Sequence, residues 1–173
     1  MRGRVVVGTG GSLGSMTALH RAAAEARARD AELWVVLAWQ APLGGPGTRG
    51  GGGGTPLLTG CREGAVARLR EILHTAFGAG LPPGVTLAGL TVRGTPGAAL
   101  VDTVRDPGDL LVVGTGSRGP LLRVLRPSVA RYCLAHAPCP VLAVPPSPLQ
   151  ADLDAVRRRN AWRRPLNAAE PAR

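Results

Sequence analysis

Two glycine-rich turns hold the residues of this sequence that are best suited to bind phosphate. Thr9, Gly10, Gly11 and Ser12 follow a run of three valines, and residues 114–119 (Gly-Thr-Gly-Ser-Arg-Gly) end a second apolar run. Glycines allow a turn to point several main-chain N–H groups at one anion, and the start of a nearby helix adds its own unpaired N–H groups. The turn at 114–119, with a helix start nearby, is therefore a natural place for phosphate.

Neither turn matches a motif that identifies a ligand by itself. The second turn lacks the Gly-Lys-Ser/Thr of a P-loop, and no helix opens directly after it as a dinucleotide fingerprint requires. Glycine-rich turns without that context are more often plain turns. On the residues alone, phosphate binding and a purely structural role both stay open.

The residues that could carry catalysis do not form a recognisable set. His20 and His74 fall in segments with helical periodicity, and no nucleophile pairs with either of them in the sequence. His136 and Cys139 are close together, but Pro138 separates them and no third member is evident. We predict a protein that is not an enzyme and that holds no metal.

The turns lie between segments that alternate between strand and helix. Short apolar or β-branched runs predict strands at residues 5–7, 32–39, 85–92, 109–114 and 140–145. Apolar residues at helical spacing predict helices at residues 15–29, 64–77, 96–105 and 128–136, the last with Ser128 as its cap. This order predicts an α/β fold, an open doubly wound parallel sheet with helices on both faces. In such sheets ligands bind beyond the carboxyl ends of the strands, where the strand order reverses.

Two segments lack this alternation. Residues 41–55 are dominated by Gly and Pro, including five consecutive glycines at 50–54, and predict a mobile loop inserted between two elements. Residues 146–173 are rich in Pro and Arg and predict an extended tail.

The charge of the chain is strongly positive but dispersed. All 21 basic residues are Arg, which is typical of a bacterial genome of high GC content, and the formal net charge is +10. Residues 1–144 carry 15 Arg against 8 acids, and residues 145–173 carry 6 against 3. Dispersed charge without an aromatic platform predicts at most weak, non-specific contact of the Arg-rich tail with nucleic acid.

Cysteine usage and hydropathy indicate a compartment. Cys61, Cys133 and Cys139 form no CxxC pair and are expected to be free, partly buried thiols. The first four residues are too short for a secretory signal, and no apolar run approaches the roughly 18 residues of a membrane span. We expect a cytoplasmic protein that does not contact the membrane.

Several stretches of the sequence resemble the universal stress protein family. The strongest is 109–144, with Leu-Leu-Val-Val-Gly, Gly-Ser-Arg-Gly, Pro-Ser-Val and His-Ala-Pro-Cys-Pro-Val-Leu-Ala-Val. Val-Val-Val-Gly-Thr-Gly-Gly-Ser near the start is similar to the family's first strand and turn, and Ala-Glu-Leu-Trp-Val-Val-Leu-Ala-Trp also matches. The resemblance covers about residues 4–145. It implies a five-stranded sheet in the order 3-2-1-4-5, a domain at 1–145 with the loop 41–55 inserted, and a tail at 146–173.

The resemblance also implies where ATP would bind. Nucleotide-binding members share a loop of the form Gly-x-x-Gly, nine residues, then Gly-Ser or Gly-Thr. Placed without gaps, it puts Gly114 and Ser117 on the first two glycines, Pro127 on the third and Ser128 on the hydroxyl residue. The residues implied to meet a nucleotide are Thr9, Gly10, Ala38, Gly114, Gly116, Ser117, Arg118, Ser128 and Val129.

Two departures from the family pattern predict a weakened nucleotide site. Pro127 has no N–H to give and fixes φ near −65°. Members that bind ATP usually carry an Asp where this chain has Gly10, and glycine cannot replace its carboxylate. Each lost charge-assisted hydrogen bond costs about 1.5–3 kcal/mol. We therefore expect a degenerate site, with no cofactor certain and ATP as the candidate.

Two functions follow from this interpretation. The first is a non-enzymatic stress-response regulator that acts as a dimeric interaction module with a degenerate nucleotide site. The alternative is an ATP-binding stress sensor that uses the two glycine-rich turns. The family resemblance implies a homodimer that pairs through the apolar edge strand Val141–Val144. A further protein partner is compatible with either function.

Overall fold

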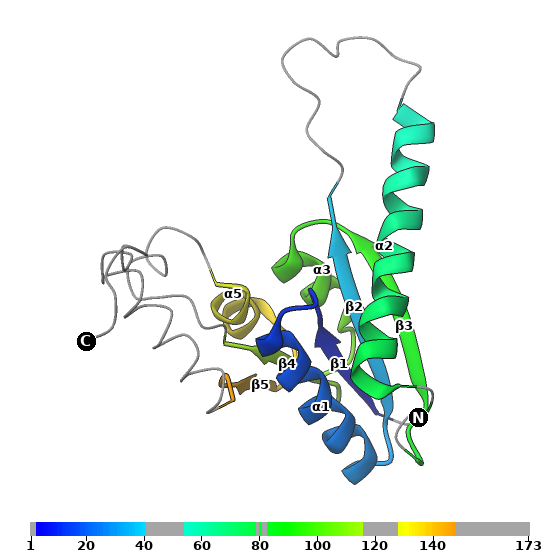
Figure 1. The fold of residues 1–173 in the computed structure, drawn as a ribbon. Helices are drawn as coiled ribbons and strands as arrows, with labels where there is room; N and C mark the ends of the chain where they lie inside the picture. Colours follow the sequence, from blue (N-terminus) through cyan, green and yellow to red (C-terminus); the bar gives the residue numbers. More distant parts are fainter. Residues whose placement is uncertain (1–2, 41–53, 79, 81–82, 116–127, 148–173) are drawn as a thin grey trace, which may run out of the picture.

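The computed structural model describes residues 3–40, 54–78, 80, 83–115 and 128–147. These residues form one parallel sheet with helices on both of its faces (Figure 1). The strands are β1 Arg4–Gly8, β2 Glu32–Trp39, β3 Leu87–Arg93, β4 Leu110–Gly114 and β5 Val141–Val144. The helices are α1 Leu13–Ala28, α2 Gly54–Phe77, α3 Pro96–Thr103 and α5 Val129–His136.

The strands lie in the order β3-β2-β1-β4-β5, as predicted, and all four neighbouring pairs are parallel. Such a sheet is buried on both faces, which explains why its central strands are continuous apolar runs. Val5, Val6 and Val7 of β1 have no exposed surface, and the four residues 110–113 of β4 are buried as well.

Two apolar clusters fill the spaces between the sheet and its helices. One packs Val5, Val7 and Val35 against α1 and α2, and the other packs Val6, Val36 and Leu111 against α3 and α5. Alternate residues of each strand therefore serve opposite faces. Ala residues dominate the buried stripe of α1, so this helix can lie close to the sheet.

An ion pair joins β1 to the start of β4 at the amino-terminal edge of the sheet, where the strands begin. The guanidinium of Arg4 donates two hydrogen bonds to the Asp109 carboxylate, at 3.1 and 2.6 Å, and lies 4.9 Å from the ring centroid of Trp34. Asp109 also accepts hydrogen bonds from the main-chain N–H groups of Arg105 and Asp106. The sequence analysis placed Asp109 at the start of a predicted strand but did not predict that its side chain would be almost fully buried.

The long second helix was predicted too short. It begins at Gly54, ten residues before the predicted start, and so includes the end of the predicted loop at 41–55. Glycines at 60 and 64 hid this extension because they are poor helix formers. A Cβ built on either glycine would meet nothing within 4 Å, so packing does not require glycine there. Leu58 and Cys61 continue the apolar stripe of the helix. The rest of that loop and nearly all of the tail lie outside the described residues.

Smaller differences occur at other ends. The first helix begins at Leu13 because Ser12 accepts a hydrogen bond from the N–H of Ser15, a helix cap that the sequence analysis did not predict. The third strand begins at Leu87 and not at residue 85. Among the described residues no helix is long and apolar enough to cross a bilayer.

Candidate functional site

The reversal of strand order places a candidate site at the carboxyl ends of β1 and β4. The chain leaves β1 through α1 and forms β2 on one side of β1, whereas β4 lies on the other side of β1. Pairing of β1 with β2 ends at Gly8 and Val36, and pairing with β4 ends at Val7 and Val112. Beyond these pairs β1 is no longer in register with β2 or β4, and open α/β sheets bind ligands at such a place.

The turn after β1 is held by hydroxyl groups and by one left-handed glycine. Ser12 caps α1, and the Ser15 hydroxyl donates to the Ser12 carbonyl at 2.8 Å. The N–H of Gly10 faces the Ser15 hydroxyl oxygen at 3.4 Å. Gly11 has a φ of 77°, a conformation that favours glycine. The predicted turn therefore exists and leads directly into a helix N-terminus.

Thr9 carries a hydroxyl group that has no partner among the described residues. The residue is 7% exposed, and its N–H donates to the Val36 carbonyl at 2.9 Å. The hydroxyl oxygen is buried and makes no hydrogen bond. Buried polar groups are nearly always satisfied, and leaving one unpaired costs about 1–3 kcal/mol. An unpaired hydroxyl at this edge is therefore the feature that a bound ligand would explain.

Ala38 presents main-chain groups to the same gap. The Val36 carbonyl accepts from Thr9 on the β1 side, and the Trp39 carbonyl accepts from Gly94 on the β3 side. Because the two directions alternate along a parallel strand, the N–H and C=O of Ala38 point toward β1. The ladder with β1 ends at Val36, so no β1 residue is in register with Ala38.

The end of β4 is packed tightly against α1. A Cβ at Gly114 would lie 2.9 Å from the Gly14 carbonyl oxygen, so only glycine fits there without a shift of the backbone. The next residue, Thr115, donates from both its N–H and its hydroxyl to the Val144 carbonyl. Gly114 therefore brings the end of β4 against the start of α1, as a shared site requires.

Gly10 differs from Gly114 in its surroundings. A Cβ built on Gly10 meets nothing within 4 Å, and its φ is not in the left-handed region. A side chain at position 10 would thus extend into open space. The missing carboxylate is a difference in chemistry and not one that packing imposes.

Ser128 and Val129 begin α5, where the family resemblance had placed phosphate contacts. The Ser128 hydroxyl accepts from the Arg131 N–H at 3.0 Å and so caps the helix, as predicted. Val129 packs its side chain against the cluster beneath α3 and α5, which leaves only its main chain for a ligand. The predicted site residues Gly116, Ser117 and Arg118 lie outside the described residues.

Arg68 was not recognised from the sequence as a site residue. A Cβ at Gly11 would lie 2.9 Å from a terminal guanidinium nitrogen of Arg68, so the cation reaches over the β1–α1 turn. The helical spacing of residues 64–77 does not predict this contact. The approach of Arg68 to the turn depends on how α2 packs across α1, which no local pattern encodes.

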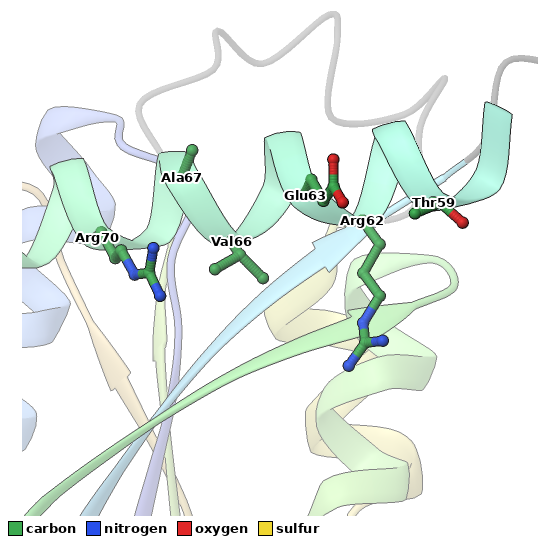
Figure 2. A pocket seen from close by; sticks show the side chains of 6 residues that line it. All are labelled: Thr59, Arg62, Glu63, Val66, Ala67 and Arg70. Carbon is green, nitrogen blue, oxygen red and sulfur yellow. The ribbon is translucent and has the colours of Figure 1, made fainter. Parts of the chain in front are cut away.

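A shallow groove on α2 is a separate feature. The described residues that line it all belong to this helix, and Figure 2 shows Arg62, Val66 and Arg70 pointing to one side of the helix. The described lining residues are Thr59, Arg62, Glu63, Val66, Ala67 and Arg70. Arg68 falls on the other side of the helix's buried stripe at 100° per residue. A groove from one element brings no convergent groups together, in contrast to the edge at β1 and β4.

The residues once considered for catalysis lie elsewhere. His136 ends α5, its Nδ1 lies 2.9 Å from the Tyr132 carbonyl, and its ring stacks on that of Tyr132. Burial and the neighbouring Cys139 raise the pKa of Cys133 to about 11, and burial also raises that of Cys139. All three cysteines are free thiols, as predicted. Among the described residues no three His, Cys, Asp or Glu side chains gather where they could hold a metal.

Comparison with known proteins identifies the family. The sequence profile of the universal stress protein family matches residues 1–145. This chain belongs to the universal stress protein family. No curated protein sequence matches it significantly.

Solved universal stress proteins share the fold. One, determined in complex with cAMP, is 30% identical, with a TM-score of 0.58 over 84% of this chain and 98% of that one. A universal stress protein from Lactobacillus plantarum is 20% identical, with a TM-score of 0.58 over 83% and 99%. Another, from Archaeoglobus fulgidus, is 23% identical, with a TM-score of 0.51 over 83% and 99%. The last two are similar in fold alone.

Proposed function

We propose that this universal stress protein is a non-enzymatic regulator that binds an adenine nucleotide at the carboxyl edge of β1, β2 and β4. The unpaired hydroxyl of Thr9 carries this proposal, because a ligand there would satisfy a group whose burial otherwise destabilises the fold. A donor from α5 or from the β1–α1 turn could meet the same ligand.

The base would lie against Ala38. An N–H and a C=O that point the same way from one residue match the acceptor and donor at the edge of adenine. The direction of the Ala38 groups supports this arrangement, since β1 no longer pairs with the strand there. The solved relative with 30% identity contains cAMP, an adenine nucleotide with a single phosphate.

The triphosphate end of the site is the weaker part. Pro127 stands where the family loop has a glycine, and Gly10 offers no carboxylate to the nucleoside. We therefore propose a lower affinity for ATP than complete family sites provide, with nucleotides of one phosphate as the better ligands. If the site has decayed completely, the chain acts as an interaction module without a nucleotide.

Calorimetric titration of nucleotide-stripped protein with cAMP, AMP and ATP tests this proposal. Wild type should bind, and Thr9→Val should bind at least about tenfold more weakly, as the loss of one ligand hydrogen bond implies. Thr103→Val is the matched control, because its hydroxyl already donates to the Ala99 carbonyl at 2.7 Å, far along the chain from the site. No heat with any of the three nucleotides would support the decayed site.

A second proposal is a homodimer through β5. Among the described residues, this four-residue strand is at the end of the sheet and pairs on one side only, with β4. The N–H of Leu111 donates to Pro140 and that of Thr115 to Val144, so by alternation Ala143 directs its main chain to the free edge. Unpaired edges of this kind favour pairing with a second copy.

Sedimentation analysis of Ala143→Pro tests the dimer. Proline removes the N–H that faces the partner and keeps the bonds to β4, so the variant should be a folded monomer where wild type is a dimer. A monomeric wild type would contradict the proposal.

We also propose that the protein is located in the reducing cytoplasm, and its three free thiols support this location.

A further inference from the structure

Arg68 lies beside the candidate site and belongs to none of the segments that the family pattern marks. It extends from α2 over the β1–α1 turn, with a terminal nitrogen 2.9 Å from the Cβ position of Gly11. Ile72, one turn further along α2, is 3.3 Å from the same point and fixes the helix against the turn. This contact keeps α2 close to the turn, so that the guanidinium of Arg68 lies beside Gly11.

The charge of Arg68 is weakly compensated. Its nearest carboxylate is Glu71, 3.9 Å away on the same helix, and both side chains are more than half exposed. Exposed pairs at such a distance contribute little. The contrast with Arg4, which makes two hydrogen bonds to a buried carboxylate, is clear. Among the residues that the structure describes, no other group is paired with the Arg68 guanidinium, which leaves most of its donors for a ligand.

The neighbouring residue Gly10 makes this cation more significant. A carboxylate at position 10, as the family resemblance implies for ATP-binding members, would stand one residue from Gly11, which Arg68 covers. Glycine leaves that space open and uncharged. An anionic group of a ligand can then approach the guanidinium without competition from a carboxylate at position 10.

We propose that Arg68 is the phosphate-binding residue of this site. Its planar fork can donate two parallel hydrogen bonds to one phosphate, which an ammonium or a single N–H cannot do. The ligand would then place its base at Ala38, meet the Thr9 hydroxyl, and place a phosphate between Arg68 and the start of α1. This inference rests on the proposed nucleotide binding and adds the residue that distinguishes nucleotide from nucleoside.

Titration of Arg68→Gln with adenosine and AMP tests the inference. Wild type should bind AMP more tightly than adenosine, and Arg68→Gln should lose about tenfold or more for AMP with adenosine unchanged. Arg68→Lys should fall between the two. Arg70→Gln is the matched control, since Arg70 is on the same helix and lines the separate groove. It should bind both ligands as wild type does.

The outcomes separate this inference from the proposed function. Equal AMP affinity in wild type and Arg68→Gln, with binding retained, would overturn the role of Arg68 and leave the nucleotide site intact. An equal loss for adenosine and AMP would make Arg68 a structural residue and overturn the inference as well. No binding of either compound to wild type would overturn the proposed function itself, and the inference with it.

Discussion

The sheet has an amino edge, where its strands begin, and a carboxyl edge, where they end. These two edges are built in opposite ways. At the amino edge, Arg4 bonds to the Asp109 carboxylate and lies over the Trp34 ring, and the buried carboxylate accepts hydrogen bonds from four donors. At the carboxyl edge, Thr9 has a buried hydroxyl without a partner among the described residues, and Arg68 has only a distant carboxylate. The same five apolar strands run from one edge to the other, so the two edges differ only in the polar groups placed at them.

This difference separates stability from binding. Polar groups that are satisfied within the protein hold the strands together and leave nothing for a ligand. Polar groups that remain unpaired cost stability and are retained where something else completes them. We therefore expect substitutions at the amino edge to change folding, and conservative substitutions at the carboxyl edge to change binding.

Asp109→Asn should give the largest effect on folding. The substitution leaves the partly buried Arg4 without its counter-charge, and we expect a loss of about 2–4 kcal/mol in the free energy of unfolding. Urea denaturation measures this loss, with Asp106→Asn as an exposed control from the same turn. Nucleotide affinity should not change. Equal stability of the two variants would contradict the role assigned to the amino edge.

The same ion pair predicts a dependence on acid. Burial alone would raise the pKa of Asp109, but the hydrogen bonds from Arg4 and from the Asp106 and Arg105 N–H groups outweigh it and hold the pKa below its usual value. A carboxylate with a lowered pKa stabilises the fold fully above its unfolded pKa of about 3.9 and loses that contribution as the pH falls through the folded value.

Unfolding free energies measured from pH 7 down to pH 2 test this sign. Wild type should lose stability below about pH 4, whereas Asp109→Asn should lose less over the same range. Parallel curves for the two proteins would show that another carboxylate is responsible.

Two glycines at the carboxyl edge provide a matched pair of smaller effects. Gly114→Ala pushes a methyl group against the Gly14 carbonyl and should destabilise by about 1–3 kcal/mol, as overpacked sites do. Gly10→Ala meets open space and should change stability by less than about 0.5 kcal/mol. Thermal unfolding of both variants measures the difference. If Gly10→Ala is as destabilising as Gly114→Ala, the space at position 10 is not open.

The sequence predicted the fold well because apolar runs and helical spacing are local signals. Five strands, their order by family resemblance and the cap at Ser128 are all found in the structure. The start of α2 was missed because its first turns carry glycines, and propensity underrates a helix that extends a buried stripe.

The site was predicted only in part, since its key features are not local. Thr9, Gly10, Ala38 and Gly114 could be placed on turns and strand ends from the sequence. That the Thr9 hydroxyl lacks a partner, and that Arg68 reaches Gly11 from α2, depends on contacts between distant segments. The ion pair of Arg4 with Asp109 was missed for the same reason, as the two residues are 105 positions apart.

The stability of Thr9→Val, measured by urea denaturation with and without saturating AMP, tests the central claim most directly. The substitution removes an unpaired buried hydroxyl and keeps the shape of the side chain. Without ligand the variant should be as stable as wild type or more stable, by about 1 kcal/mol, and AMP should stabilise it less than it stabilises wild type. A variant that is less stable without AMP, and that AMP stabilises as much as wild type, would show that the Thr9 hydroxyl serves the fold and not a ligand.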